Sequence, residues 1–295
     1  MRKLTLLTTL GLSLLLMSSC NSKVSDEALT EENYLHEDSL LWIAFNNETE
    51  DLFSLLENQP ESKDSIIDIY NAMIEEANRK NIALAFKYAS TPSGLARLFM
   101  TRNYIDKDTL RQVLASLPND MQKSKMGLNI KAHLDTEQLS VGSTLVPFPC
   151  VTEENVEFDW NQLKGKQILL LYGGLGCMGD EGREYLKTLY KQTNREDLEI
   201  VLYWPSSSIE DLKSVKEHYV GNDYAFVSDF KLDASPIRIK YGCQATPTCF
   251  FTDKDHIIVV KTEGLNIDMV YVIAAYHDLG RLVDNKTHNI ESAKM

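Results

Sequence analysis

Residues 165–180 read GKQILLLYGGLGCMGD. After the Gly-Lys turn, residues 168–172 form a continuous apolar run, which is typical of a central strand that is buried on both faces. Three glycines follow within four residues, and Cys177 comes directly after them. Apolar residues at helical spacing then extend over about residues 180–191. This succession of strand, glycine-rich turn and helix predicts the first part of a parallel βαβ unit.

The chain downstream of this unit alternates between strand-like and helix-like patterns. We predict a second buried strand, a second helix, a short helical turn, a β-hairpin and a closing helix, over residues 198–204, 209–219, 235–241, 248–261 and 266–282. Upstream, residues 156–160 alternate strictly between apolar and polar side chains, as an edge or hairpin strand does. The order β-α-β-α, then a hairpin, then α, predicts an α/β sandwich.

Residues 34–138 are predicted to form a small all-α domain. Apolar side chains recur at i, i+3, i+4 and i+7 over residues 66–74, which indicates one buried helix face. Shorter helices are predicted over residues 95–100, 109–117 and 121–134, with Asp108 and the pair Asn119-Asp120 as N-caps. This region carries no chemical motif, so we expect it to serve in packing, spacing or dimerisation.

Two stretches of the C-terminal half match the active-site elements of one family. The first is the strand of residues 168–172 with Cys177 at the start of the next helix, and the second is the stretch YGCQATPT of residues 241–248. With the FFTDKD turn that follows, the segment from Gly142 to Gly264 resembles the TlpA-like, redoxin-type branch of the thioredoxin superfamily. The resemblance implies a thioredoxin-like α/β sandwich in which Pro247 is cis and, with Thr246, forms the substrate-facing loop.

The chemistry of that family uses two cysteines in a CxxC motif. The first attacks a substrate disulfide from a helix N-terminus, and the second resolves the mixed disulfide. Here the motif is Cys177-Met178-Gly179-Asp180, so the attacking position is kept and the resolving position is an aspartate. Asp180 cannot form a disulfide, and its charge, with that of Glu181, disfavours a thiolate nearby. Thiol-disulfide exchange by Cys177 is therefore expected without a CxxC resolving cysteine.

Three interpretations of Cys177 stay open at this point. It can work with a resolving cysteine elsewhere, for which Cys243 near the cis-proline loop is the best candidate, while Cys249 fits a buried small hydrophobe and Cys150 fits either role. It can act alone as a monothiol that forms mixed disulfides with an outside thiol. It can also be a relict, in a non-catalytic protein that uses the fold as an interaction surface or scaffold.

The first twenty residues indicate export. Arg2 and Lys3 precede a short apolar stretch that ends in LMSSC at Cys20, which resembles the lipobox of bacterial lipoproteins. The resemblance implies that Cys20 is lipidated and anchors the chain at a membrane of the bacterial cell envelope, facing the periplasm or the cell surface. More loosely, the helical half resembles the N-terminal region of Bacteroidetes lipoproteins. The predicted organisation is a signal peptide, a tether, a helical domain, a thioredoxin-like domain and a tail, over residues 1–19, 20–33, 34–138, 139–285 and 286–295.

The composition of the chain excludes some classes of binding partner. The net charge of −13 argues against nucleic acid, which binds to basic surfaces. No pair of cysteines and histidines has the spacing of a zinc site, so no metal is expected, and no motif calls for a cofactor. The expected partners are envelope proteins or small thiols as redox partners, together with the lipid membrane through the anchor. The four cysteines other than Cys20 allow up to two disulfides, and the oligomeric state is left open.

Overall fold

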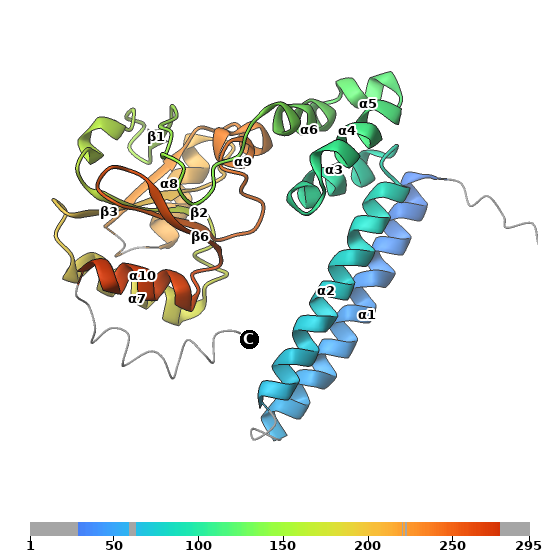
Figure 1. The fold of residues 1–295 in the computed structure, drawn as a ribbon, viewed down its shortest axis with the longest axis horizontal. Coiled ribbons are helices and arrows are strands. Elements are labelled where there is room, and N and C mark those ends of the chain that lie inside the picture. The colour runs from blue at the N-terminus through green and yellow to red at the C-terminus, as the bar shows by residue number, and fades with distance from the viewer. Residues whose placement is uncertain (1–28, 59–62, 220, 222, 278–295) are drawn as a thin grey trace, which may run out of the picture.

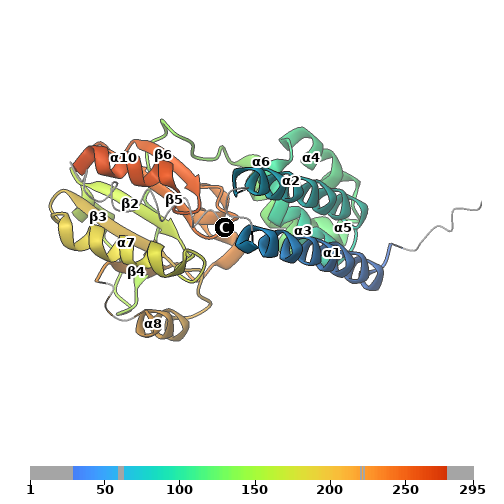
Figure 2. The ribbon, with the colours of Figure 1, turned by 90° about the horizontal axis from the view of Figure 1, so that it is seen from below.

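The computed structural model describes residues 29–58, 63–219, 221 and 223–277 of the 295-residue chain. The predictions for the signal peptide, for Cys20 and for the tail concern residues outside this described part. Within it, helices come first and a mixed sheet follows, which confirms the prediction of an α/β fold preceded by an all-helical region. Figures 1 and 2 show the helices of residues 31–135 on one side of the molecule and the sheet on the other.

The described helical region begins with two long helices that pack side by side. These are α1 (Glu31–Asn58) and α2 (Lys63–Lys87), which form an antiparallel hairpin in Figure 1. Shorter elements follow: α3 (Pro92–Thr101), the 3₁₀ turn η2 (Arg102–Tyr104), α4 (Lys107–Ser116), α5 (Asn119–Lys123) and α6 (Lys125–Asp135). None of the described helices is both long and apolar enough to cross a membrane.

The short helices α3, α4 and α6 begin at side-chain caps, whereas α5 has Pro118 as its N-cap residue and no side-chain cap. The predicted N-caps Asp108 and Asn119-Asp120 are therefore wrong, because both lie inside helices. The N-cap of α4 is Asp106, whose carboxylate accepts a hydrogen bond from the Thr109 amide at 2.8 Å, so Asp108 lies inside the helix. The predicted helix over residues 121–134 is two helices, because the Ser124 hydroxyl accepts from the Gly127 amide and starts α6 anew. Such a cap satisfies a backbone donor that would otherwise be unpaired at the helix start.

Arg97 of α3 holds the hairpin against the rest of the helical region. Its guanidinium donates to both carboxylate oxygens of Asp38 in α1, at 2.9 and 3.1 Å, and to the Tyr34 hydroxyl at 3.0 Å. The groups are partly buried, so this ion pair is less screened than a surface pair. The apolar core of the helical region includes Ile239, which belongs to the C-terminal half. The helical region and the sheet region therefore share core residues.

The sheet has six strands in the described residues, in the order β1-β4-β3-β2-β5-β6. They are β1 (Val151–Thr152), β2 (Gln167–Tyr172), β3 (Leu198–Tyr203), β4 (Ala225–Ser228), β5 (Thr248–Thr252) and β6 (Ile258–Glu263). Strands β2, β3 and β4 are parallel to one another, and β5 pairs antiparallel with β2. Strand β6 pairs antiparallel with β5, so the two form a hairpin at this edge of the sheet. The predicted central strand β2 is confirmed, and each of its six residues is buried.

One predicted strand is wrong, and two short strands were not predicted. Residues 156–160 form no strand: Glu157 makes one isolated bridge with Val151, and Trp160 begins the 3₁₀ turn η3 (Trp160–Leu163). The alternation there arises because Phe158 and Trp160 point into the core from an irregular segment. Conversely, β1 and β4 were not predicted, since strands of two and four residues show too little periodicity.

Both faces of the sheet are covered. One face packs against α7 (Gly179–Gln192), α8 (Ile209–His218) and α10 (Ile267–His277), through Leu186, Leu212 and Ile273 among others. The other face packs against the extended segment before β2 and against α9 (Pro236–Ile239). Figure 1 shows α7 and α10 along one face and the β1 segment on the other. Because β2 is covered on both faces, it is a rigid support for the loop that follows it.

Candidate active site

The loop between β2 and α7 presents Cys177 at the surface. Its first residue is tied to the sheet, because the Gly173 amide donates to the Tyr203 carbonyl of β3 at 2.8 Å. Leu175 is fully buried and anchors the middle of the loop. The amides of Cys177 and Met178 then both donate to the Gly174 carbonyl at 3.0 Å, which turns the chain outward. The Cys177 side chain is consequently exposed.

Gly174 brings this loop against the loop before β5. The Thr246–Pro247 peptide bond is cis, as the resemblance predicts. A Cβ atom placed on Gly174 would lie 2.3 Å from the Pro247 nitrogen and 2.6 Å from its Cα, and Gly174 has φ +86°. Only glycine permits both this left-handed backbone and this close approach. The two predicted active-site loops therefore meet at Gly174 and Pro247.

The thiol of Cys177 lies beside Thr246. Its Sγ is 3.7 Å from the Thr246 Oγ1, within hydrogen-bonding range for sulfur, and either group can be the donor. Helix α7 begins two residues after the cysteine, with Met178 as its N-cap residue and no side-chain cap. A hydroxyl at this distance can donate to a thiolate and stabilise it. The structure thus places Cys177, Thr246 and Pro247 together.

Asp180, at the degenerate resolving position, points into solvent. Its side chain is 98% exposed and forms an ion pair with Arg183 one turn later. The same guanidinium donates to the Leu175 carbonyl at 2.8 Å, so Arg183 also holds the loop that carries Cys177. The Asp180 charge, one of the two that we expected to oppose a thiolate, is therefore paired with a cation. The i,i+3 spacing of Asp180 and Arg183 is the sequence signal that could have indicated this pair.

The other three cysteines in the described residues are buried and free. Burial raises the pKa of the Cys150 and Cys243 thiols to about 12 and also raises that of Cys249. Cys243 lies in the core on the α9 face of the sheet, whereas Cys249 in β5 lies in the core on the opposite face. The structure therefore holds no bond between Cys177 and the candidate resolving Cys243, and such a bond requires Cys243 to leave the core.

Alkylation of the native protein is expected to modify Cys177 and to spare these three thiols. Iodoacetamide reacts with the thiolate, and a buried thiol with a raised pKa offers neither access nor a thiolate near pH 8. Mass spectrometry of peptides from the lipid-free chain, residues 21–295, should show one modified cysteine in native buffer and four in denaturant. Rapid modification of Cys243 in native buffer would contradict this, since it would mean that the cis-proline loop opens.

Apolar and aromatic side chains border the exposed thiol. Met178, Trp204 and Tyr219 are half-buried, and the rings of Trp204 and Tyr219 are in contact with centroids 6.0 Å apart. A side chain on Gly176 would come within 3.3 Å of the Tyr219 hydroxyl, so Tyr219 lies next to the turn that carries the cysteine. Such a border favours a partner that brings an apolar peptide surface to the sulfur.

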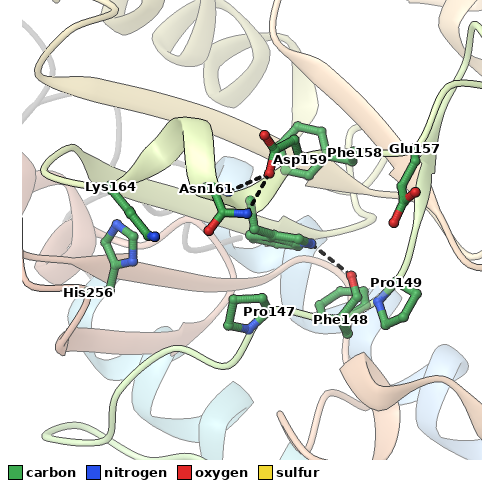
Figure 3. Close-up of a pocket in the computed structure, with 10 residues that line it drawn as sticks. Pro147, Phe148, Pro149, Glu157, Phe158, Asp159, Asn161, Lys164 and His256 are labelled. Atoms are coloured by element: carbon green, nitrogen blue, oxygen red, sulfur yellow. Dashed lines mark hydrogen bonds between the residues drawn. The ribbon is translucent and has the colours of Figure 1, made fainter.

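A separate cavity of about 520 Å³ lies at the other end of β2. Figure 3 shows Lys164 and His256 together at one end of this cavity and Glu157 with Pro149 at the other. Lys164 precedes β2 and Cys177 follows it, and six strand residues span about 20 Å. The cavity is therefore apart from the thiol, and no cysteine lines it. Among the described residues, no group of three or more His, Cys, Asp or Glu side chains could hold a metal ion.

No family model and no curated protein matches the chain. Among solved structures, the chain is similar to the thioredoxin domain of a thiol-disulfide oxidoreductase from Bacteroides vulgatus, with 20% identity and a TM-score of 0.41 over 48% of this chain and 99% of that one. It is also similar to a thiol-disulfide oxidoreductase from Bacteroides fragilis, with 13% identity and a TM-score of 0.40 over 46% and 99% of the two chains.

The strand order and the loops define the class of the C-terminal half. One sheet holds a parallel β2-β3-β4 unit and an antiparallel β5-β6 hairpin. A cis-proline precedes β5, and the exposed cysteine after β2 faces the loop that contains this proline. This is a thioredoxin-like fold, preceded in this chain by helices.

Proposed function

We propose that this chain is a lipid-anchored thioredoxin-like protein of the bacterial envelope that carries out thiol-disulfide exchange through Cys177. The observation that carries the proposal is the exposed Cys177 sulfur, 3.7 Å from the Thr246 hydroxyl and beside the cis Pro247 loop. Reactive cysteines are accessible and have a group nearby that stabilises the thiolate, whereas structural cysteines are buried. Cys150, Cys243 and Cys249 are of the structural kind.

The proposed exchange proceeds in two steps. The Cys177 thiolate attacks one sulfur of a partner disulfide, forms a mixed disulfide with it and displaces the other sulfur as a thiolate. A second thiol from outside the chain, on a small molecule or on an envelope protein, then attacks the mixed disulfide and releases Cys177 as a thiolate. The disulfide bond passes to that outside thiol, and Cys177 ends in its starting oxidation state. Asp180 takes no part in the second step because it has no sulfur.

Membrane attachment rests on the N-terminal pattern alone. We propose that residues 1–19 are removed, that Cys20 carries the lipid and that the residues between Cys20 and α1 form the tether, on the periplasmic or cell-surface side of a bacterial membrane. Incorporation of a labelled fatty acid by the full-length chain, and its loss in Cys20→Ser, tests this part separately from the exchange chemistry.

The exchange itself is tested with oxidised glutathione. Incubation of the lipid-free chain should add the mass of one glutathione at Cys177 and none in Cys177→Ser, because the buried thiols are out of reach. Addition of a reduced thiol should reverse the modification. If the wild-type chain gains no glutathione, or gains as much in Cys177→Ser as without the change, the proposed function is wrong.

One observation favours a second candidate function, that of a non-catalytic scaffold or interaction protein. Asp180 is almost fully exposed where a resolving cysteine would lie, and Cys243 is fully buried, so no second thiol in the described residues is positioned to resolve. A wild-type chain that alkylates at Cys177 but never forms a mixed disulfide would leave this function as the better one.

A further inference from the structure

Two arginines are buried where the helical region meets the sheet region. Arg102 in η2 is fully buried, and Arg238 in α9 is 2% exposed. The ring of Phe99 lies against both guanidinium groups. Its centroid is 4.0 Å from the Cζ atom of Arg102 and 5.2 Å from the Cζ atom of Arg238. Burial of one cation costs free energy, and burial of two cations close together costs more, unless each donates hydrogen bonds to strong acceptors.

Arg102 donates to the Phe99 carbonyl within the helical region at 2.7 Å, and the other backbone acceptors of the two arginines belong to residues 238–244, the segment that leads to the cis-proline. Arg102 donates to the Cys243 carbonyl at 3.0 Å and to the Arg238 carbonyl at 2.7 Å. Arg238 donates to the Cys243 carbonyl at 3.1 Å and to that of Gln244 at 3.2 Å, and it also pairs with Asp233 at 3.3 Å. The Cys243 carbonyl is thus shared by one arginine from each region.

Asn103 adds two further bonds from the helical region to the same segment. Its side-chain amide donates to the Gly242 carbonyl at 2.5 Å, and its backbone amide donates to the Gln244 side-chain oxygen at 3.2 Å. Asn103 is exposed, unlike Arg102, so it reaches the segment from the rim of the contact. Three consecutive residues, 242 to 244, are therefore held by η2.

Only Ala245 separates this segment from Thr246. The Ala245 carbonyl accepts a hydrogen bond from the Thr248 hydroxyl at 2.7 Å, which fixes the far side of the turn to β5. Thr246 itself is exposed, and its hydroxyl faces the Cys177 sulfur. With both sides of the turn fixed, the position of Thr246 follows from the position of residues 242–244.

We propose that η2 of the helical region positions the Cys177 site: Arg102 and Asn103 hold residues 242–244 so that the Thr246 hydroxyl stays against the thiol. This deepens the proposed function, on which it rests for the identity of the reactive group, and it assigns the helical region a part in the chemistry. Arg102 and Asn103 are positioning residues, because they act through Thr246 and do not touch the sulfur.

The test compares two arginines of the helical region. Arg102→Met removes the bonds to residues 238 and 243, whereas Arg97→Met removes the ties to Asp38 and Tyr34, which lie away from the loop. In folded protein at pH 7.5, the rate constant for alkylation of Cys177 by iodoacetamide should fall about threefold or more in Arg102→Met and stay unchanged in Arg97→Met. Arg102→Lys should restore part of the rate, because its ammonium keeps a charged donor group at one nitrogen, although it lacks the fork of the guanidinium.

Two further variants keep the test decisive. Asn103→Ala alters an exposed residue and should fold even if Arg102→Met does not, and we expect it to slow alkylation in the same direction. In a Thr246→Val background, the effect of the η2 variants should vanish, because the group through which they act is gone. Equal slowing in Arg97→Met, or an effect that persists with Thr246→Val, would overturn the proposal.

The alkylation readout also separates this inference from the proposed function. A chain that forms no mixed disulfide with glutathione, yet loses Cys177 reactivity in Arg102→Met, would refute exchange and retain the positioning. A chain that exchanges normally with every η2 variant, at unchanged alkylation rates, would refute the positioning and retain exchange.

Discussion

Gly174→Ala is expected to lower the free energy of unfolding by about 4 kcal/mol, through a left-handed backbone that alanine disfavours and an overlap that the core cannot relieve. The new Cβ would meet the Pro247 nitrogen at 2.3 Å and its Cδ at 2.5 Å. These atoms belong to a loop fixed on both sides, by η2 and by β5, so they cannot move aside without breaking hydrogen bonds. Urea unfolding followed by circular dichroism measures the change.

Gly165→Ala is the matched control for this substitution. Gly165 has φ +78°, close to the +86° of Gly174, but a Cβ atom there meets nothing within 4 Å. It should therefore lose only the backbone contribution, about 1–2 kcal/mol. The difference between the two variants isolates the contact between the loops. If both variants lost the same free energy, the close approach of Gly174 to Pro247 would have no energetic weight.

The elements that could be predicted from the sequence are those whose signal is local. The run of residues 168–172 is apolar except for the Tyr172 hydroxyl, so burial on both faces follows from the residues themselves. The hairpin of β5 and β6 follows from two apolar stretches around a polar turn, and the confirmed cis peptide bond follows from the resemblance at Pro247.

The wrong assignments come from signals that tertiary structure overrides. In residues 156–160 the apolar side chains alternate because two aromatic rings reach the core, and the indole of Trp160 donates to the Phe148 carbonyl at 2.8 Å. That bond, together with the cap at Asp159, makes a 3₁₀ turn where a strand was expected. Pattern alone does not distinguish alternate burial in an irregular segment from alternate burial in a strand.

The candidate site was predicted only as far as motifs reach. Cys177, Thr246 and Pro247 come together as the family resemblance implies. Arg102 and Asn103 were not anticipated, because each bonds to backbone atoms about 140 residues away and backbone acceptors leave no residue-specific pattern. A buried arginine in a short helical region is unusual, yet its burial is visible only once the two regions are packed together.

The protein is expected to lose stability steeply above pH 9 because of its three buried thiols. Burial raises the pKa of Cys150 and Cys243 to about 12, and it raises that of Cys249, from an ordinary value of 9.0. In the folded state these thiols stay protonated, whereas in the unfolded chain they ionise near pH 9, so the unfolded state binds fewer protons. Stability is therefore complete below pH 9 and falls as pH rises toward the folded-state values. Each thiol should contribute a loss of about 1.3 kcal/mol between pH 8 and pH 10.

The thiol contribution is measured as a difference between variants. Urea unfolding at pH 8 and pH 10 gives the loss for the unmodified chain, about 3–4 kcal/mol from the three thiols together. Cys243→Ala and Cys249→Ala should each reduce this loss by about a third, whatever their effect on the absolute stability at pH 8. The buried tyrosines also lower the free energy of unfolding as pH rises, but this contribution is the same in all variants and cancels in the differences between them. Cys177→Ala is the control, because the exposed side chain has no burial to lose on unfolding.

An equal pH dependence of the free energy of unfolding in Cys243→Ala and Cys177→Ala would mean that Cys243 already meets solvent in the folded state. That result would make Cys243 accessible as a resolving partner for Cys177, so the same measurement also tests whether the thiol acts alone.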